Sequence, residues 1–350
     1  MAFIGREREL ARLSAALQRA AEGTPTRLVL RAPTGAGTSA LLDELQTRLG
    51  DVPGVVVARG RASESAAGAA YFALAEALDA ALARLPDHEL ARVVGAGGHD
   101  LAVLIPVMEA RLARLGIATA EPPLVAPDQR GSRVVESVIG AIERLGRDGV
   151  VLLVLEDLHW ADPATRAFVE GLLRISRRLP LCLVVTYDPD EFHRRHPGRP
   201  LVRTLESSAT AEVLSLQPLD RDDLAAFAEA IIGERPAASL LAALLEGSGG
   251  NPLLASQLLA AHASADGFRR SEGFEAVMQA RLAALPVQAT RVLQVRPVLR
   301  EFQVLPVLQA LPESQVPRES PALPEVRQVQ PALRGPEVPA AAVRPAGSHR

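Results

Sequence analysis

The sequence predicts an α/β fold in which a mostly parallel sheet is flanked by helices and followed by a small all-helical domain. Three observations favour this class. Residues 150–155 and 181–186 are unbroken apolar runs, typical of strands buried on both faces of a parallel sheet. The helical segment between them completes a strand–helix–strand unit. From residue 220 to about residue 293 the apolar spacing is only helical.

The remaining elements follow from apolar spacing, with Gly and Pro as breaks. Further strands are expected at 26–32, 55–58 and 212–216. Asp162 and Pro163 are suited to the N-cap and first position of one helix. Helices are expected at 7–21, 39–49, 66–85, 91–115 with breaks at its glycines and Pro106, 133–145, 163–178, 220–232, 237–246, 252–261, 274–285 and 287–293.

These elements divide the chain into three parts. We expect an α/β domain at 1–216, a helical lid domain at 217–294 and a truncated or disordered Pro-rich tail at 295–350. Residues 311–350 hold eight of the 27 prolines and lose apolar periodicity. A frameshift is one hypothesis for this change of character.

Composition excludes several classes of protein. The 350 residues are 48% hydrophobic with a net charge of −3, which argues against global disorder and against general attraction to nucleic acid. The single cysteine, Cys182, rules out an internal disulfide. No apolar run reaches the ~18 residues of a membrane span, and the N-terminus lacks an apolar signal core. We therefore expect a cytoplasmic protein with no membrane partner.

A glycine-rich loop, A-P-T-G-A-G-T-S at 32–39, lies between a predicted strand and a predicted helix. A phosphate-binding loop reads G-x-x-x-x-G-K-[ST] in that context. Gly37 and Ser39 match the pattern, whereas Ala32 replaces its first glycine and Thr38 its lysine. All 38 basic residues of the chain are arginines, so no other lysine can substitute.

The backbone part of the loop chemistry is retained. Gly35 and Gly37 can adopt positive φ, and the amides from Gly35 to Ala40 can converge on an anion at a helix N-terminus. The charge part is lost, because Thr38 donates one neutral hydrogen bond and is too short to reach a γ-phosphate. Taken alone, the loop favours interpretation as a simple glycine-rich turn.

Two acids, Glu156 and Asp157, end the apolar strand that precedes them. Phosphoryl-transfer sites need one carboxylate to hold Mg²⁺ and another to orient the attacking water. Acids at the carboxyl end of a central strand also lie where α/β sheets bind ligands. Together with the loop, they predict a P-loop NTPase fold with ATP or ADP and Mg²⁺ as cofactors.

Four segments carry a family resemblance: F-I-G-R-E-R-E-L at 3–10, L-E-D-L-H-W-A-D-P at 155–163, G-G-N-P-L at 249–253 and R-L-A-A-L-P at 281–286. Over roughly residues 2–294 the chain resembles the STAND-type AAA ATPase modules, an Orc1-like AAA ATPase domain, of large ATP-binding LuxR-family transcriptional regulators. The family usually continues with a winged helix, a repeat array and a DNA-binding helix-turn-helix. No DNA-binding module is visible in this chain.

The resemblance implies a role for each matching position. Ile4, Gly5 and Arg6 would line the adenine pocket, and Pro252 would close over the base. Ser39 and Glu156 would hold Mg²⁺, and Asp157 would be the catalytic acid. The implied cofactor-binding set is Ile4, Gly5, Arg6, Pro33, Thr34, Gly35, Ala36, Gly37, Thr38, Ser39, Ala40 and Pro252.

Three departures from the family pattern put hydrolysis in doubt. Thr38 replaces the lysine, and Ala32 replaces a glycine. Asp188 follows the strand at 181–186, where the family commonly has an arginine that senses the γ-phosphate, and its charge would repel phosphate. Losing one transition-state charge contact costs about 3–4 kcal/mol. Hydrolysis is therefore expected to be weak or absent.

The leading hypothesis is a degenerate ATP- or ADP-binding module that acts as a regulator or as a fragment of a LuxR-family regulator, with a protein partner or effector. One alternative is an active ATPase that tolerates Thr38. Another is an interaction scaffold or remnant that binds no nucleotide. The basic segment 193–203 reads as an effector or nucleic-acid contact or as a solvated loop. His159, Trp160 and Cys182 are interpreted as packing residues.

Overall fold

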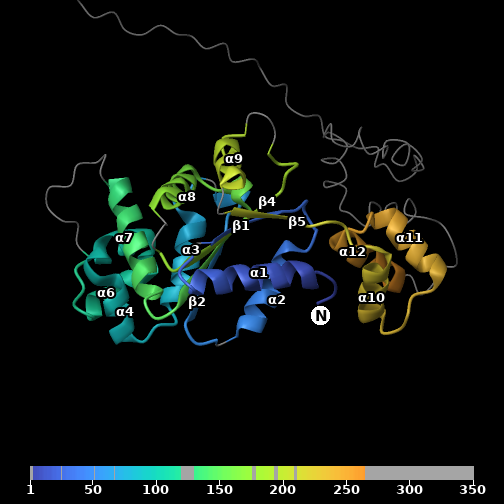
Figure 1. Ribbon diagram of the computed structural model, residues 1–350, viewed down its shortest axis with the longest axis horizontal. Helices are drawn as coiled ribbons and strands as arrows, with labels where there is room; N and C mark the ends of the chain where they lie inside the picture. The colour runs from blue at the N-terminus through green and yellow to red at the C-terminus, as the bar shows by residue number, and fades with distance from the viewer. Residues whose placement is uncertain are drawn as a thin grey trace, which may run out of the picture. The chain divides into compact units, whose positions relative to one another are not determined.

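The computed structural model describes residues 3–264, except residues 25, 51, 67, 120–129, 176–178, 193–195 and 209–210 (Figure 1). The described residues belong to one compact unit. The helices predicted at 274–285 and 287–293 and the tail predicted at 295–350 lie outside the described residues.

The sheet has five strands in the order β2-β3-β4-β1-β5, and every pair of neighbours is parallel. The sequence prediction of a mostly parallel sheet is therefore confirmed. Its carboxyl ends all lie at one edge, where a ligand site is expected. The strands are β1 (Thr26–Arg31), β2 (Val55–Arg61), β3 (Val150–Glu156), β4 (Leu181–Tyr187) and β5 (Ala211–Ser215).

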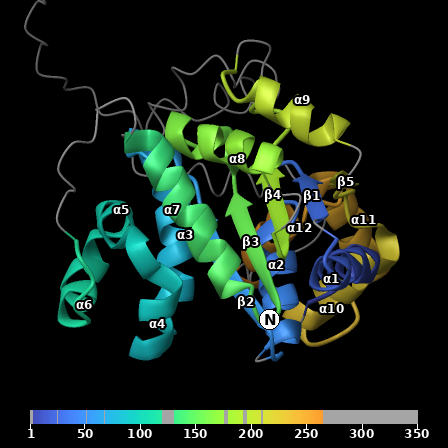
Figure 2. The same ribbon diagram turned by 60° about the vertical axis from the view of Figure 1, so that its left-hand side comes forward.

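Helices cover both faces of this sheet, as Figure 2 shows for α1 on one face and for α3, α7 and α8 on the other. The helices that precede β4 are α1 (Glu7–Ala21), α2 (Thr38–Leu49), α3 (Phe72–Leu82), α4 (Asp87–Val94), α5 (Gly98–Leu104), α6 (Glu109–Arg114), α7 (Arg130–Leu145) and α8 (Pro163–Ile175). After β4 come α9 (Arg199–Ser207), α10 (Arg221–Ile232), α11 (Ala238–Ser248) and α12 (Pro252–Ser264).

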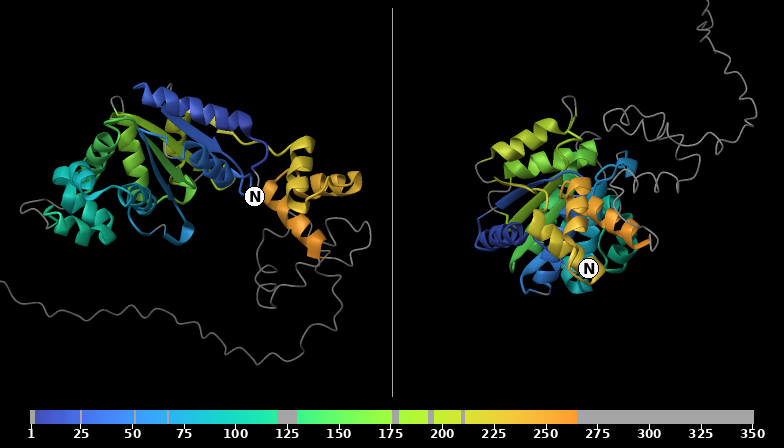
Figure 3. Two further views of the ribbon diagram at one scale, coloured as in Figure 1. Left: turned by 90° about the horizontal axis from the view of Figure 1, so that it is seen from below. Right: turned by 90° about the vertical axis from the view of Figure 1, so that its right-hand side faces the viewer.

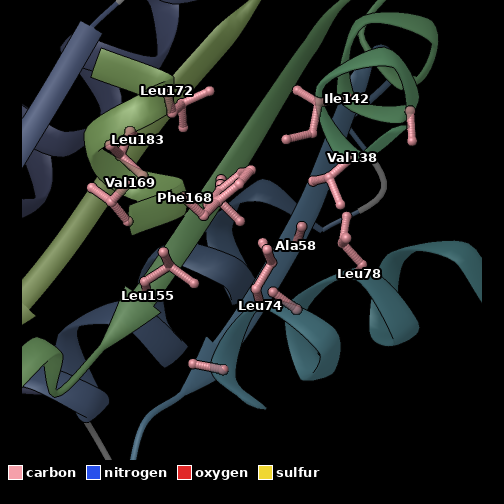
Figure 4. Packing of buried hydrophobic residues seen from close by; sticks show 14 of the residues in the cluster. Ala58, Leu74, Leu78, Val138, Ile142, Leu155, Phe168, Val169, Leu172 and Leu183 are labelled. Carbon is pink, nitrogen blue, oxygen red and sulfur yellow. The ribbon is translucent and has the colours of Figure 1, made fainter. Parts of the chain in front are cut away.

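Alternation along β3 divides the core into two layers. Leu153 and Leu155 join a cluster that contains Phe168 of α8, whereas Leu152 and Val154 join the cluster of α1 and α2. Figure 4 shows Phe168 and Leu155 among side chains of α3, α7 and α8. Burial on both faces explains why the sequence of β3 is a continuous apolar run.

The backbone of α3 lies directly against β2. A Cβ atom at Gly60 would lie 1.9 Å from the carbonyl oxygen of Ala73 and 2.8 Å from the amide nitrogen of Ala77. No real Cβ contact is that short, so only glycine fits this position.

Helices α10, α11 and α12 pack together around a small apolar cluster that includes Leu224, Leu244 and Leu259 (Figure 3). Asp220 caps α10 by accepting hydrogen bonds from the amides of Asp222 and Asp223. The helical character expected after residue 220 is thus present as far as residue 264. The boundary between residues 216 and 217 stays a prediction.

Several predicted elements have wrong boundaries, and two of these errors have a clear structural cause. Strand β2 runs on to Arg61 instead of ending at Ala58, because two arginines continue its backbone pairing with β3. The helix expected from residue 66 begins only at Phe72, because Tyr71 adopts a left-handed conformation with φ 62°. Among the described residues, no helix is long and apolar enough to cross a membrane.

Candidate nucleotide site

The predicted loop and the predicted acids meet at the carboxyl edge of the sheet. The loop at 32–37 joins β1 to α2, and Glu156 ends β3. Strand β4 lies between these two strands, so the residue that follows it, Asp188, lies between the loop and the acids. The parallel topology therefore brings together residues that are far apart in the sequence.

The glycines shape the loop as the sequence predicts. Gly35 has φ 84° and Gly37 has φ 91°, both in the left-handed region that favours glycine. Helix α2 starts at Thr38 without a side-chain cap, so its first amides are available to an anion. Pro33 accepts a hydrogen bond from the amide of Ala36, which closes the turn.

Ser39 and Glu156, predicted to hold Mg²⁺, are in contact. The Ser39 hydroxyl donates to Oε2 of Glu156 over 2.9 Å. Mg²⁺ prefers hard oxygen ligands and usually takes few from the protein, completing its shell with phosphate and water. The described residues contain no group of three or more His, Cys, Asp or Glu side chains able to hold a metal. A hydroxyl and one carboxylate therefore fit a magnesium ion shared with a phosphate chain.

Two arginines of β2 pair with the two acids. Nε of Arg59 donates to Oε1 of Glu156 over 2.6 Å, and the same guanidinium reaches Asp43 of α2. Nε of Arg61 donates to Asp157 over 2.6 Å. The hydrogen bond to Asp157 raises the pKa of Arg61. Both acids therefore carry cationic partners in the protein itself.

Asp188 is hydrogen-bonded to the glycine-rich loop at 32–39. Its Oδ2 accepts hydrogen bonds from both the amide and the hydroxyl of Thr34, each over 2.6 Å. Its Oδ1 accepts from the amide of Asp190, and its own amide donates to Nδ1 of His159. The Asp188 carboxylate, which the sequence analysis expected to repel phosphate, is thus hydrogen-bonded to the loop.

Asp157 has an unusual backbone. Its φ is 57°, and its amide donates to the hydroxyl of Thr186 on β4 over 2.9 Å. This conformation turns the chain into the short 3₁₀ helix Leu158–Trp160. Non-glycine residues in such conformations cluster at functional sites.

A cavity of about 340 Å³ collects most of the residues expected around a base. This volume is in the range of small-molecule pockets. Ile4, Arg6, Ala36, Gly37, Ala40 and Pro252 line it together with Phe3, Asp43, Glu44, Thr47, Leu219 and Phe227. Gly5 lies beside this cavity, where a Cβ would come 3.2 Å from Asp223 of α10.

Helix α12 contacts the loop through its first residues. Nδ2 of Asn251 donates to the carbonyl of Thr34 over 3.0 Å, and the amide of Leu253 donates to the carbonyl of Gly35. A Cβ at Gly35 would lie 2.7 Å from Oδ1 of Asn251. The G-N-P-L segment therefore packs on the loop itself.

Sequence reasoning missed Arg59, Arg61 and Asn251. The two arginines were missed because the predicted strand stopped at Ala58. The register of parallel strands was the signal that could have found them, since Arg61 pairs with Glu156 across the sheet. Asn251 stands next to Pro252 in the G-G-N-P-L segment at 249–253, but nothing in the sequence indicates its contact with Thr34.

The residues interpreted as packing residues are buried or half-buried. His159 is buried, and burial lowers its pKa below the ordinary value. Cys182 is buried in β4, which raises the pKa of its thiol to about 12. Of the basic segment 193–203, residues 193–195 lie outside the described residues, and residues 199–203 lie in helix α9 and not in a loop.

Five parallel strands, a glycine loop between β1 and α2 and acids after β3 define a P-loop NTPase fold. The model of the AAA ATPase domain family matches residues 2–185. The chain therefore belongs to the AAA ATPase domain family.

The individual proteins that are similar to this chain share low sequence identity with it. An uncharacterized protein of Rhizobium meliloti is 28% identical over 190 residues, which cover 50% of this chain and 17% of that protein. The structure of Aeropyrum pernix Orc1 in complex with DNA has a TM-score of 0.44 at 20% identity, covering 84% of this chain and 72% of that one. The Walker-type ATPase of Pyrococcus abyssi has a TM-score of 0.46 at 13% identity, covering 87% and 76%.

Proposed function

We propose that this chain is a degenerate STAND-type module that binds ATP or ADP and hydrolyses little or none of it. The observation that carries the proposal is the Ser39–Glu156 hydrogen bond beside a glycine loop that has no lysine. The loop backbone, Ser39 and Glu156 would still support nucleotide binding, while the positive charge of a loop lysine is missing. Its place would be within, or as a fragment of, a LuxR-family transcriptional regulator, as the four resembling segments suggest.

Binding would rest mainly on backbone donors. Amides from Gly35 to Ala40 surround the start of α2, where the helix dipole favours an anion. Ser39 and Glu156 would hold Mg²⁺, whose chemistry is to neutralise charge on phosphate oxygens. The base would enter the cavity lined by Ile4, Arg6 and Pro252.

Hydrolysis would be weak for three reasons. Thr38 offers no charge to a transferring phosphoryl group. Asp157, at the position of the catalytic acid, is bonded to Arg61 and would have to leave it to orient water. Asp188 adds a negative charge at the loop. These features argue against the active ATPase that tolerates Thr38.

The single tryptophan provides the test. Trp160 follows the two acids by three residues and is half-buried, so its fluorescence should report titrations with Mg-ATP and Mg-ADP. Thr38→Lys restores one charged contact, and it should tighten binding about tenfold or more, because charged hydrogen bonds contribute about 1.5–3 kcal/mol. Phosphate release from the wild type should not exceed that from Glu156→Gln.

Each outcome decides between the hypotheses. Saturable quenching in the wild type supports a nucleotide-binding module without the lysine. A response from Thr38→Lys alone would favour the interaction scaffold. Silence in both proteins, confirmed by calorimetry, would overturn the proposal.

A further inference from the structure

Thr34 is the loop residue with the most engaged polar groups. Its amide and hydroxyl both donate to Asp188, and its carbonyl accepts from Asn251. All three of its polar groups therefore have protein partners. A phosphate that approached Thr34 would have to displace a carboxylate that already takes two short hydrogen bonds.

The Asp188 carboxylate is firmly held. The residue is 6% exposed, and its second oxygen accepts from the amide of Asp190. The backbone amide of Asp188 is bonded to His159, and the neighbouring carbonyl of Tyr187 accepts from the amide of Ala32. Moving this carboxylate away from the loop breaks three hydrogen bonds at once, so the carboxylate is held beside the loop.

Three arginines near the site have protein partners already. Arg59 pairs with Glu156 and Asp43, and Arg61 pairs with Asp157. Arg6 donates to the loop carbonyl of Ala36 and to Glu9. The loop itself has threonine where a lysine would reach the β- and γ-phosphates. The amides of Gly35 and of residues 37–40 remain for a short phosphate chain, whereas that of Ala36 donates to Pro33, and no charge on the loop compensates a third phosphate.

We infer that the site selects nucleoside diphosphates over triphosphates and that Asp188 is the residue that discriminates. The inference rests on the proposed nucleotide binding and names its ligand class. Two phosphates interact with the amides at the start of α2. A third adds negative charge on the side of the loop where the carboxylate lies, and like charges in a partly buried site repel strongly.

The test compares Mg-ADP with the magnesium complex of a non-hydrolysable ATP analogue, by calorimetry on the full chain. The wild type should bind the diphosphate at least tenfold more tightly. Asp188→Asn keeps an oxygen acceptor for Thr34 and removes the charge, so the ratio should fall below threefold through a gain for the triphosphate. Asp190→Asn is the matched control: it removes an exposed carboxylate two residues away, and the ratio should stay as in the wild type.

The outcomes separate this inference from the function on which it rests. Saturable but equal binding of both nucleotides by the wild type overturns the selectivity and leaves the nucleotide module standing. A tenfold ratio that Asp188→Asn leaves unchanged also contradicts the inference. No binding of either nucleotide overturns the proposed function itself. The wild-type ratio needs no variant, so a misfolded Asp188→Asn still leaves a decisive measurement.

Discussion

At the scale of single residues, the site depends on charges that compensate each other. The side chain of Glu156 is 5% exposed, and that of its partner Arg59 is 19% exposed, so this ion pair is largely buried. The pair of Arg61 and Asp157 is more open, with 58% and 26% exposed. Removing one partner of a buried ion pair costs more stability than removing one partner of an exposed pair.

We expect Arg59→Met to lower the free energy of unfolding by about 3 kcal/mol, because it leaves the buried Glu156 carboxylate unpaired. Arg61→Met removes one partner of the more exposed pair and should lower the free energy of unfolding by no more than about 1 kcal/mol. Urea unfolding measures both. Equal losses in the two variants would contradict the distinction, and Glu156→Gln combined with Arg59→Met should recover part of the loss.

His159 gives the molecule a pH dependence. Burial lowers its pKa, opposed by Asp157, Asp188 and Glu191 and assisted by Arg61. The folded protein thus binds fewer protons here than the unfolded chain, whose histidine titrates near its ordinary pKa of about 6.5. The contribution of His159 to stability is full above that pH and falls as the pH drops through it.

His159→Asn keeps an acceptor for the amide of Asp188 and does not titrate. The stability difference between wild type and His159→Asn should therefore shrink as the pH falls below about 6.5, because the unfolded chain gains the proton before the folded protein does. Urea unfolding at several pH values measures it.

At the scale of elements, the apolar runs predicted β3 and β4 well because both faces of these strands are buried. The same signal failed at β2, since Arg59 and Arg61 satisfy their charges at the sheet edge and interrupt the apolar run. It failed again before α3, where the left-handed Tyr71 delays the helix. A pattern of hydrophobicity cannot show a bond between distant residues, such as that of Asp188 to Thr34.

Asp162 joins two elements. Its carboxylate accepts from the amides of Ala164 and Thr165, as the predicted N-cap of α8, and also from the amide of Tyr71 before α3. The expected cap is thus confirmed, and its second role was not foreseen.

We expect Asp162→Ala to lower the melting temperature more than Asp220→Ala does. The first variant removes a buried cap that serves two helices, at a cost of about 2 kcal/mol, whereas Asp220 is an exposed cap worth about 1 kcal/mol. Differential scanning calorimetry compares them. A larger loss at Asp220 would show that the link between α3 and α8 contributes nothing.

At the scale of the whole described molecule, the helices after β5 and the loop after β1 support each other. Asn251 and Leu253 contact the loop at Thr34 and Gly35, and Arg6 donates to the carbonyl of Gln217 in the connection. Apolar spacing predicted the helices, and the phosphate-loop pattern predicted the loop. The contact between them could not be predicted, because it depends on how two distant segments pack.

Gly35→Ala should weaken this contact. Its Cβ would approach Asn251 and Leu253 within 2.7–2.8 Å, in addition to the strain of a positive φ. Gly233→Ala is the matched control, since its φ of 83° carries the same strain with nothing within 4 Å. We expect the free energy of unfolding, measured with urea, to fall by about 1 kcal/mol in Gly233→Ala and by about 2–4 kcal/mol in Gly35→Ala. Faster proteolysis of residues 216–219 should accompany only Gly35→Ala.

The close approach of α3 to β2 has a consequence for how this chain can evolve. In a library of every single substitution, position 60 should tolerate glycine alone, because any side chain collides with the carbonyl of Ala73. Gly68, with nothing within 4 Å of its would-be Cβ, should accept most replacements. Selection for the fold alone should therefore hold position 60 fixed, whereas position 68 is free to vary.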